Sequence, residues 1–308
     1  MCGRGPANSP TIRSWSKTRS RGAVPQAGMS CRFFHLLATR LISGRFFVVC
    51  CVLATCGCAT KSVWHPDESE AARQSRLTRG CIFYFDGAGG GTARENYAGG
   101  VMRGLRDAGY PGEAEMMAWE TGHGLFADEV ASVSYKRAKA VRDAKRILAY
   151  RRAHPEAPAS LLGFSAGTAE AVFALECLDE LESVNHVVLL GAAISRDYDM
   201  TEALKRVRGR LYIITSTHDR MLGIAMPFAG TADRKFHDPG AGLRGFVLPR
   251  GASSATRKLY AEKIVTIPYE KEFRKDKDRG LHFDNVKEGF IRDFVAPLLM
   301  GSAGESRE

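Results

Sequence analysis

Residues 163–167 have the sequence GFSAG, in which Ser165 stands between two glycines. A serine hydroxyl attacks a carbonyl carbon effectively only when a base removes its proton. The flanking glycines suit a very sharp turn, because side chains there would clash with neighbouring backbone. An apolar run precedes the motif and an alanine-rich segment follows it, which predicts a strand, a turn that exposes Ser165, and a helix. The alternative is an ordinary strand–turn–helix in which the serine only caps the helix.

The base for such a serine would be a histidine further along the chain. Of the four histidines that follow Ser165, only His282 lies beyond the last predicted strand, in a loop before the final predicted helix. We therefore expect His282 to take the proton of Ser165. His237 is the second choice, because it lies within a long segment, 223–257, that precedes the last strand.

A carboxylate is needed to orient the histidine. Asp219 comes just after a predicted strand at 211–215, and we expect it to accept the N–H of His282 and fix its tautomer. Asp197 and Asp199, which follow the preceding strand, are the fallback. The alternative for Asp219 is a role limited to capping a turn.

Two backbone N–H groups are expected to bind the oxyanion that forms during acyl transfer. One should come from Ala166, the residue after the nucleophile, and the other from the glycine-rich loop 86–91, where Ala88 is the best candidate. A phosphate-binding interpretation of this loop fails, because G-x-G-x-x-G counted from Gly87 would require glycine where Thr92 stands.

Strand-like and helix-like segments alternate along the chain, which predicts an α/β fold with a mostly parallel sheet and helices on both faces, as a single domain over 80–300. Segment 223–257 is long for a connection and is a candidate lid or pocket wall. The expected strands are 81–85, 115–119, 159–162, 186–190, 211–215 and 263–268, and the expected helices are 97–108, 135–152, 168–181 and 285–299.

Together, Ser165, Asp219 and His282 in this order, each after a predicted strand, resemble the α/β-hydrolase superfamily over roughly residues 80–300. The resemblance implies hydrolysis of a carboxylic ester or thioester through an acyl-enzyme on Ser165, with no metal and no organic cofactor. Many members begin the oxyanion loop with His-Gly, where this chain has Asp86-Gly87. A non-catalytic binding protein of the same fold and an acyltransferase are the alternatives.

The N-terminal segment, 1–58, has the pattern of an export signal. Arg40 and Arg45 precede an apolar run at 46–54, which is too short to span a bilayer as a helix. Residues 54–59 resemble a bacterial lipoprotein box, with Cys58 as the expected lipidated residue and Cys56 as the alternative. This pattern predicts a lipid-anchored or otherwise exported protein of the cell envelope, with a polar tether at 59–79 and a flexible tail at 301–308. A plain cleaved signal peptide is the other possibility.

The net charge of +10 belongs mostly to that segment. Residues 1–58 contain eight basic and no acidic side chains, which leaves 36 basic against 34 acidic residues in the remainder. No nucleic-acid partner is therefore expected. Six of the eight cysteines also lie in 1–58, and the two others, Cys81 and Cys177, make neither a disulfide framework nor a zinc motif. The oligomeric state stays open.

Overall fold

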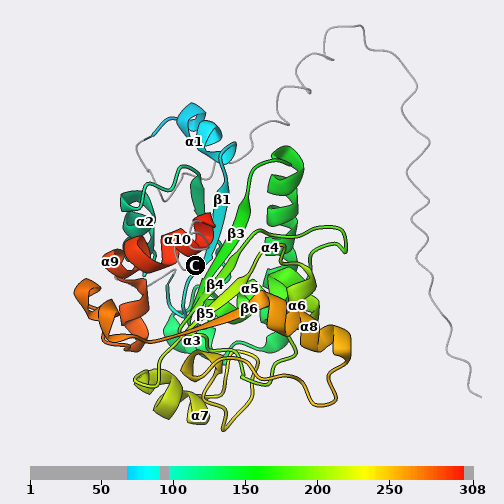
Figure 1. The fold of residues 1–308 in the computed structure, drawn as a ribbon, viewed down its shortest axis with the longest axis vertical. Coiled ribbons are helices and arrows are strands. Elements are labelled where there is room, and N and C mark those ends of the chain that lie inside the picture. The colour runs from blue at the N-terminus through cyan, green and yellow to red at the C-terminus, as the bar shows by residue number, and fades with distance from the viewer. Residues whose placement is uncertain (1–67, 91–96, 302–308) are drawn as a thin grey trace, which may run out of the picture. The chain divides into compact units, whose positions relative to one another are not determined.

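Six short strands, most of them runs of apolar residues, pair side by side in one parallel sheet (Figure 1). The computed structural model describes residues 68–90 and 97–301. The central strands are buried on both faces, which is why their sequences are continuous apolar runs and do not alternate with polar residues. In sheet order the strands are β2 (Glu113–Met116), β1 (Cys81–Phe85), β3 (Ala159–Phe164), β4 (Val187–Leu190), β5 (Leu211–Thr215) and β6 (Ile264–Pro268).

Helices cover both faces of this sheet, and each face has its own apolar core. This arrangement confirms the predicted α/β class with a parallel sheet. One face packs against α4 (Val133–Ala153), α5 (Gly167–Glu176), α6 (Thr201–Lys205) and α8 (Ser254–Lys263), and the other against α2 (Ala98–Asp107), α9 (Glu288–Phe290) and α10 (Ala296–Met300).

Short elements surround the ends of the strands. They were not predicted from the sequence, because each is too brief to show a helical period. These elements are α3 (Leu125–Val130), the π-helical turn η1 (Met221–Ala225), α7 (Met226–Ala229), and the 3₁₀ turns η2 (Ala241–Leu243) and η3 (Lys271–Asp276).

The final helix, predicted as continuous over 285–299, is interrupted. The 3₁₀ turn η4 (His282–Val286) comes first, and the π turn η5 (Ile291–Val295) separates α9 from α10. Pro297 explains the π turn, because it has no N–H to continue the i→i−4 ladder. A wider turn forms instead, in which the N–H of Ala296 donates to the carbonyl of Ile291.

Part of the segment predicted as a polar tether is helical. Ser69 caps α1 (Glu70–Leu77) by accepting from the N–H of Ala72. Arg76 then pairs with buried Glu113 at 3.0 Å, at the start of β2, and the Tyr150 hydroxyl donates to the Leu77 carbonyl at 2.8 Å. These contacts fix α1 beside the N-terminal ends of the strands. Residues 1–67, with Cys56 and Cys58, lie outside the described residues, as do 302–308. No helix in the described ranges is long and apolar enough to cross a membrane.

Helix α2 approaches the C-terminal helices closely at Gly104. A Cβ atom there would lie 2.5 Å from the Glu288 carbonyl oxygen and 2.6 Å from the Ile291 Cβ. We predict that Gly104→Ala lowers the free energy of unfolding by about 1–3 kcal/mol through overpacking, although alanine is the better helix former. Denaturant titration followed by circular dichroism measures this change. Gly223→Ala is the control, because its Cβ would meet only Leu243 at an ordinary 3.6 Å; an equal loss in both variants would contradict the explanation.

Candidate active site

Ser165 occupies a strained turn between β3 and α5. Its φ of 51° lies in the left-handed region, which a non-glycine residue adopts at a cost. The glycines on either side are needed for space: a Cβ on Gly163 would lie 2.9 Å from the Thr168 Cα, and one on Gly167 would overlap the carbonyl oxygens of Phe85 and Asp86. The turn thus lifts the Ser165 side chain out of the sheet while the backbone around it stays tightly packed.

The structure brings together the three residues that the sequence singled out. The His282 Nε2 lies 2.8 Å from the Ser165 Oγ, and the His282 Nδ1 lies 2.7 Å from the Asp219 Oδ2. Both partners of the second contact are buried, with exposed side-chain fractions of 4% for His282 and 1% for Asp219. In this geometry the Nδ1–H donates to the carboxylate, and Nε2 is left to accept the serine proton.

Two loops at the ends of neighbouring strands hold this arrangement. Asp219 follows β5, and its Oδ1 accepts from the N–H of Leu222 at 3.0 Å, so both carboxylate oxygens are engaged. His282 is the first residue of η4, which comes after β6 in the chain. The Ser216 hydroxyl donates to the Gly280 carbonyl at 2.6 Å and ties the two loops together. Asp219 and His282 therefore keep their relative positions through backbone contacts as well as their own hydrogen bond.

The imidazole is also positioned by its neighbours on either side. The ring of Phe164 lies 5.2 Å from the His282 ring, as does the ring of Phe283. Gly191, at the end of β4, has a φ of 51°, and a Cβ there would lie 3.1 Å from both the Cε1 and the Nδ1 of His282. A glycine at 191 thus leaves room for the imidazole to face Ser165.

The two predicted oxyanion donors flank Ser165. Ala166 directly follows it, and the loop of Ala88 lies against it, since a Cβ on Gly87 would be 3.2 Å from the Ser165 Cβ. Within the part of the chain that the structure describes, the backbone N–H groups of Ala88 and Ala166 have no hydrogen-bond acceptor. Both donors are thus free to bind an oxygen of a ligand.

Two buried carboxylates, Asp86 and Asp128, shape the loop of Ala88, and the second was not predicted from the sequence. The Asp86 Oδ1 accepts from the Tyr84 hydroxyl at 2.7 Å and from the Gly87 N–H at 2.8 Å. Asp128 on α3 accepts from the Gly89 N–H at 2.8 Å. Burial raises the pKa of Asp86. Asp86 therefore holds its own loop through these hydrogen bonds.

The alternative candidates for the acid and the base lie away from Ser165. Asp197 pairs with Lys235, and Asp199 accepts from the N–H and hydroxyl of Thr201 at the start of α6. His237 is in an exposed turn, where its N–H donates to the Pro227 carbonyl. None of the three contacts Ser165, Asp219 or His282.

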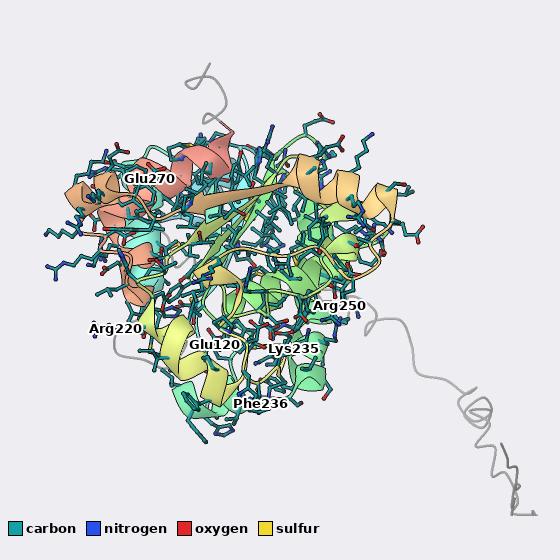
Figure 2. The ribbon with its side chains drawn as sticks, turned by 60° about the horizontal axis from the view of Figure 1, so that its bottom comes forward. Glu120, Arg220, Lys235, Phe236, Arg250 and Glu270 are labelled. Carbon is teal, nitrogen blue, oxygen red and sulfur yellow. The ribbon has the colours of Figure 1, made fainter. Side chains whose placement is uncertain are left out.

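Two buried ionisable side chains, Glu170 and Lys136, lie on the helices α5 and α4, which pack against each other. Glu170 is on α5, five residues after Ser165, and neither of its carboxylate oxygens has a hydrogen-bond partner among the described residues. Burial raises the pKa of Glu170 to about 8 and lowers the pKa of Lys136 on α4. The Lys136 ammonium donates to the Ala232 carbonyl at 3.1 Å, which anchors segment 223–257 to α4. Burial also raises the pKa of Glu120, labelled in Figure 2, to about 7.

The Glu170 carboxyl predicts a pH dependence of stability. Its pKa is raised from 4.5 to about 8 in the folded chain, so the unfolded chain loses the proton first as pH rises. Stability should therefore fall between these two values, by up to about 1.4 kcal/mol per pH unit from this group. Glu170→Gln, which stays neutral, should gain stability over the parent chain as pH rises. Unfolding titrations at about pH 5 and about pH 9 measure the difference. Exposed Glu202→Gln serves as control, and a Glu170→Gln curve parallel to the parent's would contradict the prediction.

No three or more His, Cys, Asp or Glu side chains in residues 68–90 and 97–301 are grouped so that they could hold a metal ion. No model of a known protein family matches this sequence, and no curated protein matches it.

Proposed function

We propose that this protein is a serine hydrolase with the α/β-hydrolase fold, which cleaves a carboxylic ester or thioester through an acyl-enzyme on Ser165. The observation that carries the proposal is the continuous hydrogen-bonded chain from the Ser165 hydroxyl through His282 to Asp219. A serine that only capped a helix would need neither this chain nor a left-handed backbone. The position of each of the three residues after a strand of a parallel sheet gives further support.

Each group has a role in the proposed reaction. As the Ser165 Oγ attacks the substrate carbonyl carbon, the His282 Nε2 takes the hydroxyl proton, and Asp219 stabilises the imidazolium. The N–H groups of Ala88 and Ala166 bind the oxyanion. The imidazolium then gives its proton to the departing alcohol or thiol, and the acyl group stays on Ser165. A water, deprotonated by His282, then attacks the acyl carbon. The bond from that carbon to the Ser165 Oγ breaks, the imidazolium returns its proton to Oγ, and the acid is released.

The proposed place of action is the cell envelope, with Cys58 as the site of lipid attachment. Support for this part comes from the sequence alone, because the signal-like segment lies outside the described residues. Mass spectrometry of the mature N-terminus tests it independently of the hydrolase activity.

The central test is covalent labelling of Ser165. We expect a fluorophosphonate probe to modify Ser165, as located by peptide mass spectrometry, and the chain to hydrolyse nitrophenyl esters. Ser165→Ala should abolish labelling, and Asp219→Asn should slow hydrolysis by about 10²–10⁴ through loss of the correct histidine tautomer. His218→Gln is the matched control, since this exposed histidine adjoins Asp219 without contacting Ser165. A folded chain that never reacts with the probe would overturn the proposal, and product formed only with an added alcohol would indicate acyl transfer.

Gly191 offers a second, independent test of the geometry. Gly191→Ala should slow labelling of Ser165 by about 10–100-fold, because the added methyl group displaces the imidazole from the serine. Gly251→Ala controls for backbone strain: its φ of 72° is equally unfavourable, but nothing lies within 4 Å of its Cβ position. The labelling rate is compared with the free energy of unfolding for both variants. Similar rates in the two would rule out the proposed role of the space at Gly191.

A further inference from the structure

Exposed apolar side chains gather around the opening to Ser165. Fourteen large apolar side chains are exposed in the described residues, and nine of them lie in α3, in η1 and α7, in the loop that follows α7, and beside His282. Elements α3 and α7 are at the lower end of the molecule in Figure 1. We call these nine residues the apolar rim: Leu125, Phe126, Val130, Met221, Ile224, Phe228, Phe236, Leu281 and Phe283.

Contacts within the domain connect the segments of the rim to the site. Helix α3 begins against the oxyanion loop, where a Cβ on Gly89 would lie 2.9 Å from the Leu125 Cβ. Turn η1 starts two residues after Asp219, whose carboxylate accepts from the Leu222 N–H. Phe236 packs on the C-terminal end of α7, 3.2 Å from the Cβ position of Gly230. Leu281 and Phe283 flank His282 in the sequence. The rim therefore surrounds the entrance to the nucleophile on several sides.

The charged groups beside the rim favour an anionic partner. Figure 2 shows Arg220 and Lys235 on the same face as Phe236. Among the acidic side chains of these segments, Asp128 binds the Gly89 N–H, Asp233 binds the N–H and hydroxyl of Ser195, and Glu129 is half-buried on α3. The exposed or half-buried basic residues in and near the rim are Arg220, Arg234, Lys235, Lys277, Arg279 and Lys287. Lys235 pairs with Asp197 and Lys287 with Asp284, whereas the other four form no ion pair with the described residues.

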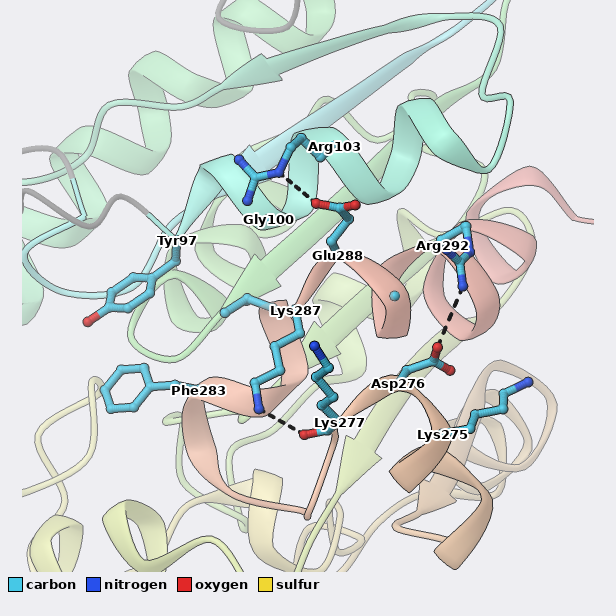
Figure 3. Close-up of a pocket in the computed structure, with 12 residues that line it drawn as sticks. Tyr97, Gly100, Arg103, Lys275, Asp276, Lys277, Phe283, Lys287, Glu288 and Arg292 are labelled. Carbon is cyan, nitrogen blue, oxygen red and sulfur yellow. Dashed lines mark hydrogen bonds and ion pairs between the residues drawn. The ribbon is translucent and has the colours of Figure 1, made fainter.

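An open cavity of about 740 Å³ continues from the rim at Phe283 (Figure 3). Its wall at this end is the stacked pair of Phe283 and Tyr97, with ring centroids 5.1 Å apart. Five basic and two acidic side chains line the cavity, and four of the basic ones form ion pairs with Glu288, Asp276, Asp293 or Asp284. The basic ones are Arg103, Lys275, Lys277, Lys287 and Arg292, and the acidic ones are Asp276 and Glu288.

We propose that the apolar rim docks on a lipid bilayer that carries anionic headgroups, and that substrate reaches Ser165 from that surface. Apolar side chains from separate short elements, interleaved with cations, fit a fluid interface: the apolar groups enter the acyl region and the cations remain among the headgroups. Docking needs only the rim, whereas the entry of substrate rests on the proposed hydrolase function.

Vesicle flotation tests the docking step. All residues of both apolar cores lie between residues 77 and 299, so a chain that begins at residue 61 keeps the folded part and lacks the signal-like segment. The Ser165→Ala form of this chain separates binding from hydrolysis. We expect it to float with vesicles of phosphatidylcholine and phosphatidylglycerol, more weakly with phosphatidylcholine alone, and more weakly in high salt.

Substitutions then locate the surface. Phe126→Ser with Phe228→Ser, at side chains 77% and 79% exposed, should weaken vesicle binding at least tenfold. Arg220→Glu with Arg279→Glu should remove the preference for phosphatidylglycerol. The matched control is Leu181→Ser, an apolar side chain 98% exposed outside the rim, which should bind like the parent chain. Circular dichroism checks that all variants stay folded.

Three outcomes would overturn the docking proposal: no vesicle binding by the parent chain, equal binding by the Phe126/Phe228 variant, or an equal loss in Leu181→Ser. Sedimentation analysis addresses a second copy as the occupant; a dimer that the Phe126/Phe228 substitutions dissociate, without vesicle binding, would assign the rim to self-association. Because binding is measured without the Ser165 hydroxyl, a failure of fluorophosphonate labelling would leave the docking result intact.

Discussion

The close approach of two turns, one after β1 and one after β3, is the constraint on which the site depends. Gly167 lies so near the carbonyl groups of Phe85 and Asp86 that no side chain fits there. This contact puts the glycine loop beside Ser165 and aligns two backbone N–H groups with one hydroxyl. The strain at Ser165 follows from the same approach, and the surrounding core offsets it, since β3 and α5 are buried along most of their length.

Buried carboxyl groups stabilise the loops around this contact by different means. Asp86 and Asp128 accept backbone N–H groups, so each offsets part of its desolvation by hydrogen bonds. Glu170 on α5 has no such partner among the described residues, and burial raises its pKa to about 8. Asp219 is the carboxylate that hydrogen-bonds His282. The carboxyl groups that hold the loop of Ala88, Asp86 and Asp128, are therefore different from the one that contacts the imidazole, Asp219.

The sequence predicted the features that leave a local pattern. Apolar runs marked five of the strands, and the glycines around Ser165 marked the sharp turn. Strand β2, expected at 115–119, lies instead at Glu113–Met116, where two glutamates interrupt the apolar pattern. His282 and Asp219 could be selected because parallel strands end at one edge of the sheet, which brings residues after successive strands together. Asp128, Glu170 and Lys136 could not be found in this way, because each matters through a contact with a residue distant in sequence.

Short elements escaped prediction for a related reason. Helices α3 and α7 span less than two turns, and their exposed apolar side chains read as ordinary loop residues until the structure groups them around Ser165. Helix α1 looked like a polar tether because its stability depends on Arg76 reaching Glu113 and on the burial of Leu77. In each case contacts with residues distant in the chain determine the local structure, and these contacts cannot be predicted from the pattern of neighbouring residues.

The docking of α1 also determines how an attached molecule would be oriented. Helix α1 is fixed where the strands begin, whereas Ser165 and its partners follow the ends of the strands (Figure 1). If Cys58 carries a lipid, the chain from there to Glu68 can extend over no more than about 35 Å. A molecule attached there would therefore join the domain at the end of the sheet opposite to Ser165.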